Sequence, residues 1–229
     1  ANAMGPVFGL LKKSFETNAD DLLIYQKGLG LTAEQMKSLG SIAIATGTPL
    51  EDLLKETGNL ALQMGDKFGI SSKELGRDLG YMTQNMGKFG SMTKTQMITS
   101  TVFTRKLGLE IKELEGLISK FDDFESTAEG ASRLAQAFGM NVDALEMMKE
   151  QDPAKRLDML RKSFAATGKS IENMSRQERA LLAETSGLDE NTVALALSTK
   201  NMGLSYDQVQ KEAEKSNKKQ KSQAEIMQG

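Results

Sequence analysis

The fold of this chain is decided by a short recurring phrase, seen clearly in Phe138-Gly139-Met140-Asn141-Val142-Asp143. An apolar residue, a glycine, a second apolar residue and a small polar residue follow one another, often with an acid a little later. Glycine takes the left-handed conformation that ends a helix, the next apolar residue packs back on that helix, and a small polar residue caps the next one. The phrase therefore predicts a helix end followed at once by a helix start. Its other copies are Leu29-Gly30-Leu31-Thr32-Ala33-Glu34, Phe68-Gly69-Ile70-Ser71-Ser72-Lys73-Glu74, Ser186-Gly187-Leu188-Asp189 and Met202-Gly203-Leu204-Ser205.

The choice of apolar residues sets the fold class. The chain has 28 Leu and 14 Met against 5 Val and 9 Ile, and no alternating run of β-branched residues. Leu and Met lose little freedom in helices, whereas β-branched residues favour strands. We therefore expect an all-α string of about ten short, Gly-punctuated helices, irregular or extended in arrangement and ending in a longer charged helix. The expected spans are 18–28, 33–46, 49–67, 72–88, 94–106, 110–121, 127–137, 142–150, 154–166, 176–185, 190–200 and a long helix from about 206.

Two changes in composition suggest the domain organisation. The stretch Gly87-Lys88-Phe89-Gly90-Ser91-Met92-Thr93 holds two glycines and small polar residues, which is typical of a boundary. From Lys211 to Lys221 the chain is rich in charge and almost without an apolar face. The prediction is an N-terminal helical group at 1–90, a central group at 91–204, and a charged exit helix or connector at 205–229.

The composition also excludes several classes of function. With no Cys and no His, the chain cannot supply a thiolate nucleophile, a thiolate metal site or a histidine base. The formal charge of −2 gives no net field toward nucleic acid, and no apolar run reaches the roughly 18 residues of a membrane span. We expect no enzymatic activity, no cofactor, no metal site and no specific nucleic-acid partner.

One acidic segment, residues 122–126, has residues that could form a catalytic or calcium site. Phe124-Glu125-Ser126 resembles the Glu-Ser element of lytic transglycosylases, which would make Glu125 the acid and base of a murein hydrolase, but the second element of that family is scrambled here. Asp122, Asp123 and Glu125 also lack the alternating ligands and turn glycine of a calcium loop. We favour Ser126 as the cap of a helix starting near Thr127, with Glu125 exposed to solvent.

The C-terminal half resembles a known family in its order of phrases. The run Asp152–Phe164, then Met174–Ala183, then Gly187–Ala194, and Met202-Gly203-Leu204-Ser205-Tyr206 before a Lys-rich helix are similar to tail tape-measure proteins of contractile-tailed bacteriophages. The resemblance covers roughly residues 100–229. It implies a segment of a longer helical chain, present in several copies in the virion tail, that helps to set tail length, starts tube assembly and is ejected ahead of the DNA.

The same resemblance implies the partners. These are copies of the chain itself, the baseplate hub, the tail tube proteins and, on ejection, the host envelope. The short Gly-punctuated helices depart from one uninterrupted coiled coil and favour a terminal knob docked at the hub. We expect Leu204, Tyr206 and Val209 to contact the partner. The alternatives are the murein hydrolase with Glu125 as acid/base and a self-contained cytoplasmic α-helical scaffold or regulator.

Overall fold

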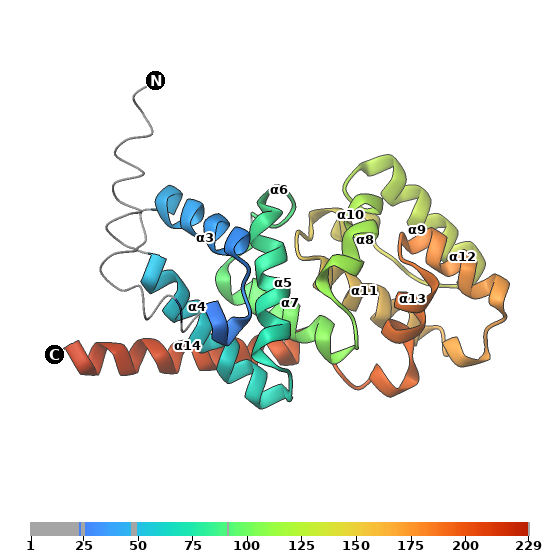
Figure 1. The fold of residues 1–229 in the computed structure, drawn as a ribbon. Helices are drawn as coiled ribbons and strands as arrows, with labels where there is room; N and C mark the ends of the chain where they lie inside the picture. Colours follow the sequence, from blue (N-terminus) through green and yellow to red (C-terminus); the bar gives the residue numbers. More distant parts are fainter. Residues whose placement is uncertain (1–22, 24–25, 47–49, 91, 229) are drawn as a thin grey trace, which may run out of the picture. The chain divides into compact units, whose positions relative to one another are not determined.

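The structure is a computed structural model that describes residues 23, 26–46, 50–90 and 92–228, and within these residues it is all-α, with no strand. The chain forms two compact units (Figure 1): unit 1 is Ala1–Gly90 with Lys215–Gly229, and unit 2 is Ser91–Glu214. Residues 205–214, the first part of the predicted exit helix, are in unit 2, and residues 215–229 are in unit 1.

Unit 1 is built from helices joined by the predicted junctions. Its helices are α3 (Ala33–Thr46), α4 (Leu50–Phe68), α5 (Ser72–Gln84), α6 (Met86–Phe89) and the C-terminal part of α14 (Tyr206–Gln228). The expected helix 18–28 lies largely outside the described residues, as does residue 49, the first residue of the expected helix 49–67. The other boundaries agree closely with the sequence, apart from the turn at Asn85 that divides the expected helix 72–88.

The glycine phrase works as predicted at most of its copies. Gly30, Gly69, Gly139 and Gly187 all have positive φ, between 63° and 74°. Gly203 is the exception, since it is not among the glycines with positive φ. At this copy of the phrase, a short 3-10 turn, η3 (Thr199–Asn201), precedes α14 in place of a left-handed glycine.

Glycines also let α5 approach the rest of unit 1. A Cβ at Gly76 would lie 1.8 Å from the carbonyl oxygen of Leu29, and one at Gly80 would lie 2.3 Å from the buried Gln35 side chain. The two glycines are four residues apart, so they lie on one face of α5. That face packs on α3 and on the turn before it.

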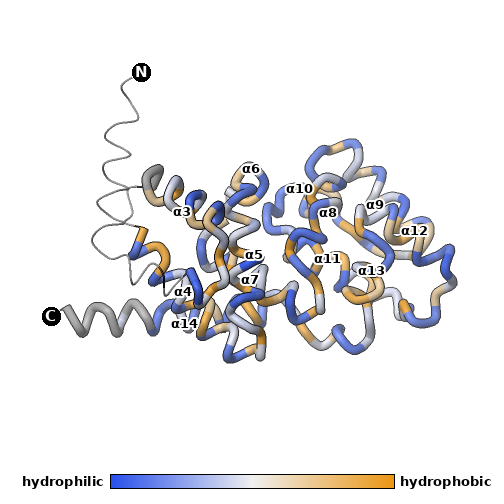
Figure 2. The backbone as a smooth tube through the Cα atoms, viewed as in Figure 1, coloured by the Kyte–Doolittle hydropathy of each residue, from blue (hydrophilic) through white to orange (hydrophobic). Residues whose placement is uncertain are grey.

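Unit 2 is organised around α11 (Pro153–Ala166), which contacts α7, α8, η1 and α13. Figure 2 shows hydrophobic residues recurring along these helices, and the buried ones include Leu157, Leu160 and Phe164 of α11. The other elements are α7 (Lys94–Lys106), η1 (Ile111–Leu114), α8 (Glu115–Lys120), α9 (Phe124–Phe138), α10 (Ala144–Lys149), η2 (Ile171–Asn173), α12 (Arg176–Ser186), α13 (Glu190–Leu197) and η3. Among the described residues, no helix is both long and apolar enough to cross a bilayer.

The start of α9 corrects one prediction. The helix begins at Phe124 and is capped by Asp123, whose Oδ1 accepts from the Ser126 amide at 2.9 Å. Ser126 is therefore inside the helix, and its hydroxyl donates to the Lys120 carbonyl oxygen at 3.0 Å. An aspartate three residues before the expected cap accepts from an orphan amide of the first turn instead, so the helix begins earlier by most of a turn.

Candidate functional site

The polar centre of unit 2 is the carboxylate of Asp152 at the N-terminus of α11. Asp152 is fully buried, with a relative exposure of 1%. Its Oδ1 accepts from the amides of Ala154 at 2.9 Å and Lys155 at 3.4 Å, which makes it the helix cap. Its Oδ2 accepts from Ser100 Oγ of α7 at 2.5 Å and from the hydroxyl of Tyr206 in α14. One carboxylate thus connects the starts of α11 and α14 to the middle of α7.

Burial changes the acid–base properties of this group. It raises the pKa of Asp152 from 3.8 to about 6, because the interior disfavours the carboxylate, and the hydrogen bonds from Ser100 and Tyr206 offset only part of that effect. Burial and the neighbouring Asp152 charge also raise the pKa of the Tyr206 phenol, which therefore stays protonated and serves as a donor. The ring of Tyr206 packs edge-on against Phe103, at 5.8 Å between centroids.

Arg161, two turns further along α11, is a second buried polar centre. Its side chain is 3% exposed and pairs with Asp158 at 2.9 Å. Its guanidinium also donates to three backbone carbonyl oxygens, those of Ala196 at 2.9 Å, Asn201 at 2.5 Å and Leu204 at 2.9 Å. It lies 5.2 Å from the centre of the Phe103 ring. Arg161 therefore fixes the connection from α13 to α14 through groups that have no helical partner.

A third α11 side chain, that of Arg156, forms an ion pair with Asp122 of the acidic segment. Arg156 is 2% exposed and donates to Asp122 Oδ1 at 2.8 Å and to the Glu150 carbonyl oxygen at 2.6 Å. Asp122 thus has a structural ion pair, and Asp123 caps α9. Within the described part of the chain, no group of three or more acidic residues is placed to hold a metal ion.

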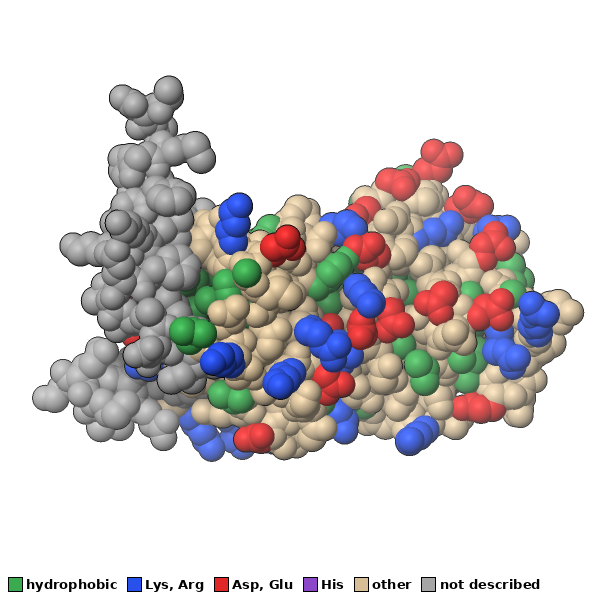
Figure 3. Space-filling view, in the orientation of Figure 1, with side chains coloured by type: hydrophobic (Ala, Val, Ile, Leu, Met, Phe, Trp, Pro, Cys, Tyr) green, Lys and Arg blue, Asp and Glu red, His purple; other side chains and the backbone are tan. Residues whose placement is uncertain are grey.

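A polar cavity of about 600 Å³ opens beside α11, between it, α10 and the first turn of α14. Five acidic and two basic side chains line it, which leaves a formal charge of −3; they are Asp143, Glu146, Glu150, Asp158, Asp207, Lys155 and Lys162. Figure 3 shows acidic and basic side chains interspersed over the visible face of the described residues.

The two lysines of the cavity are held by ion pairs. Lys155 lies 2.8 Å from Glu150 Oε2. Lys162 Nζ lies 2.9 Å from Asp158 Oδ2 and 3.0 Å from Asp207 Oδ2, so one ammonium bridges two carboxylates. Asp158 Oδ2 accepts no well-aligned hydrogen bond, and this ion pair is its contact. Burial lowers the pKa of Lys162, but the two carboxylates outweigh that effect and the net direction is upward.

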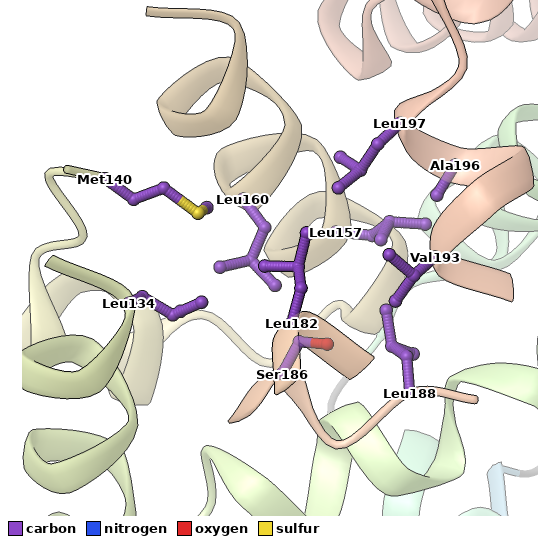
Figure 4. A pocket seen from close by; sticks show the side chains of 10 residues that line it. All are labelled: Leu134, Met140, Leu157, Leu160, Leu182, Ser186, Leu188, Val193, Ala196 and Leu197. Atoms are coloured by element: carbon purple, nitrogen blue, oxygen red, sulfur yellow. The ribbon is translucent and has the colours of Figure 1, made fainter. Parts of the chain in front are cut away.

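A second cavity lies on the other side of α11 and has a different character. It measures about 10 Å³ and is lined by apolar side chains of α9, α11, α12 and α13, which point toward one another in Figure 4. Ser186 is the one polar side chain among them. A space of this size and lining stays dry, so it is a packing defect of the core and offers no room for a ligand.

The residues predicted to bind a partner lie mainly in the interior. Tyr206 is 1% exposed and Val209 is 0% exposed, both packed within unit 2, while Leu204 is half-buried. This burial argues against direct partner contact by Tyr206 and Val209. Glu125 is exposed on the first turn of α9 and lines neither cavity.

Sequence reasoning missed the buried polar centres. The Asp152-Pro153 pair carried a usable signal, because Asp before Pro is a strong helix start. The sequence around Asp152 does not predict its partners Ser100 and Tyr206, which lie 52 and 54 positions away and complete the network.

Comparison with known proteins adds no assignment. No family model matches the chain, and neither a curated protein nor a solved structure is significantly similar to it.

Proposed function

We propose that this chain is a segment of a tail tape-measure protein of a contractile-tailed bacteriophage. It would lie in the virion tail, docked at the baseplate hub or in the tube lumen, where it helps to set tail length and to start tube assembly. Its role would be steric and mechanical, without turnover, and it would leave ahead of the DNA. Its partners would be copies of itself, the hub, the tube proteins and, on ejection, the host envelope.

One observation gives this proposal its main support. The run Asp152–Phe164, where the resemblance is most continuous, forms the centre of unit 2, and Asp152, Arg156 and Arg161 are buried in hydrogen-bonded networks. Two of these networks hold the start of the long charged helix α14, through Tyr206 and the Leu204 carbonyl oxygen. Such an anchor suits a structural protein that passes from a packed helical body into an elongated helix.

The mass of the native polypeptide in its source tests the proposal. Denaturing electrophoresis with terminal mass spectrometry is expected to find this sequence within a chain of many hundreds of residues in purified virions. A native product near 25.0 kDa, the mass of the segment alone, would contradict the tail assignment. A clearing assay on cell-wall sacculi addresses the hydrolase alternative, since clearing that disappears in Glu125→Gln would establish it.

A further inference from the structure

The joint between α11 and the first turns of α14 is closed over a buried acid. Asp152 and Tyr206 are each 1% exposed. Oδ2 of Asp152 accepts from the Tyr206 hydroxyl and from Ser100 Oγ of α7. Among the residues that the structure describes, Asp152 forms no ion pair. An acid that is buried among neutral donors favours its protonated form, because the interior disfavours the charge.

The charged residues that flank Asp152 on α11 are paired with other groups. Lys155 pairs with Glu150 at 2.8 Å, and Glu150 Oε1 accepts from the Asp152 amide at 2.9 Å. The guanidinium of Arg156 pairs with Asp122, which follows α8, at 2.8 Å. Burial therefore remains the largest effect on the pKa of Asp152 and raises it to about 6.

The hydrogen-bond network can hold a proton without losing a bond. Ser100 Oγ lies 2.5 Å from Asp152 Oδ2 and 2.9 Å from the Gln96 carbonyl oxygen. When Asp152 is neutral, its hydroxyl can donate to Ser100, which then donates to Gln96. Tyr206 can still donate to Oδ2, and Oδ1 still caps α11. The closed joint therefore accommodates the neutral acid at least as well as the carboxylate.

The polar cavity brings solvent close to this joint. Glu150 and Lys155, on either side of Asp152 in the sequence, line the cavity, as does Asp207, which follows Tyr206. Neither Asp152 nor Tyr206 is among the lining residues. Movement of Tyr206 away from α11 would let water reach Asp152, and a hydrated Asp152 regains the ordinary acidity of its carboxyl group.

The contacts on either side of Tyr206 differ in strength. Arg161, which stays protonated throughout the neutral range, holds the preceding chain through carbonyl oxygens, the last of them that of Leu204 at 2.9 Å. After Tyr206, Lys162 pairs with Asp207 at 3.0 Å, but both side chains are more than half exposed, so this pair is weak. The chain up to Leu204 is therefore anchored more firmly than the turns that follow.

We propose that residues 205–214 form a pH-sensitive latch, closed on α11 while Asp152 carries a proton and open more often once Asp152 is ionised. The closed latch binds the proton more tightly than the open latch, so a rise in pH favours opening. Val209 and Ala213 are buried at 0% exposure and keep the latch closed most of the time at any pH. The inference concerns contacts within unit 2 and does not rest on the tail assignment.

Hydrogen exchange of the whole chain, measured by mass spectrometry and corrected for the intrinsic effect of pH, tests the latch. From pH 4 to pH 7 we expect the protection of amides 209–213 to fall between about tenfold and about 100-fold, because two pKa units set the upper limit. At pH 7 these amides should be at least about tenfold less protected than amides 157–164 of α11, because the latch opens without unfolding unit 2. Equal protection of the two segments, or protection of the latch that does not change with pH, would overturn the inference.

Two variants assign the effect to one carboxyl group. Asp152→Asn removes the titrating group and keeps an oxygen to cap α11, so the protection of the latch should vary less than about threefold over the same pH range. Asp207→Asn is the matched control, because it removes an exposed carboxylate from the latch itself and should retain the native pH dependence. A pH dependence that persists in Asp152→Asn, or disappears in Asp207→Asn, would refute the role of Asp152. Circular dichroism checks that each variant is folded, and the comparison of two segments in the native chain needs no variant.

Discussion

At the scale of single residues, Asp152 has two roles that substitutions can separate: it caps α11, and it accepts a hydrogen bond from the Tyr206 hydroxyl. Asp152→Ala removes the cap of α11 and the acceptor of the Tyr206 hydroxyl, whereas Ser100 keeps a second acceptor in the Gln96 carbonyl oxygen at 2.9 Å. A lost cap costs about 1 kcal/mol and an unsatisfied buried hydroxyl about 1–3 kcal/mol, so we expect a loss of about 2–4 kcal/mol. Asp152→Asn should lose less, because its oxygen still caps the helix and both hydroxyls can rotate to accept from its amide. Urea denaturation followed by circular dichroism measures both; equal losses would contradict this account.

The pH dependence of stability provides a second test of Asp152. Burial raises its pKa to about 6, so the folded protein binds this proton at higher pH than the unfolded chain does. The contribution of Asp152 to the free energy of unfolding therefore falls as pH rises from about 4 to about 6, and is constant above. Two pKa units correspond to about 3 kcal/mol. Between pH 4 and pH 7, the free energy of unfolding of Asp152→Asn should therefore rise by about 3 kcal/mol relative to that of the native protein. A difference between the two proteins that is independent of pH would refute this prediction.

Arg161 is predicted to matter more than any surface ion pair. Arg161→Met removes a donor from the carbonyl oxygens of Ala196, Asn201 and Leu204 and leaves the buried Asp158 with Lys162 as its ionic partner. Removing one partner of a buried pair costs about 3–5 kcal/mol, and because Lys162 still pairs with Asp158 we expect a loss near the lower end of that range. Arg133 is the control, since it is 44% exposed and pairs with Glu129 and Glu184 at the surface, where a pair is worth about 0–1 kcal/mol. Thermal unfolding of Arg161→Met and Arg133→Met compares them. A similar shift in Tm for both would show that the buried network is not important for stability.

At the scale of helices, unit 2 depends on a glycine contact between α8 and the end of α12. A Cβ at Gly116 would lie 1.9 Å from the Gly187 carbonyl oxygen, so Gly116→Ala must move one backbone away from the other. We expect it to cost at least about 2 kcal/mol, as overpacking of a core does. Gly203→Ala is the matched control in the same unit, because Gly203 has open space around its Cβ position and no positive φ. Comparison of the denaturation midpoints decides the matter, and an unchanged midpoint for Gly116→Ala would show that the helices can shift at little cost.

At the scale of the whole molecule, unit 2 has a buried core of its own, as an independently folding domain does. Its core contains its own buried side chains, among them Phe103, Phe121, Leu157 and Phe164, and its polar centres are satisfied within residues 91–214. We expect a fragment of residues 91–214 to be helical and to unfold cooperatively, since domains of this length usually do. Calorimetry of the fragment tests this, with Asp152→Ala in the same fragment expected to lower its Tm. A fragment without a cooperative transition would contradict the division.

The sequence by itself determined the all-α class and most helix boundaries. The signals that set them are local: a glycine free to adopt positive φ at residues such as Gly139 and Gly187, and a cap such as Ser71 or Ser175 that reaches amides only three residues away. Where two local signals competed, as Asp123 and Ser126 did at α9, sequence reasoning chose the wrong cap.

The tertiary structure alone decided which polar groups are buried together. Ser100, Asp152 and Tyr206 belong to three helices and meet because those helices pack, which no spacing along the chain encodes. The same packing buries Tyr206 and Val209, which were predicted to contact a partner, and it places Asp158, Lys162 and Asp207 around one cavity. Periodicity and caps specify each helix separately, whereas burial and electrostatics depend on which helix faces lie against one another.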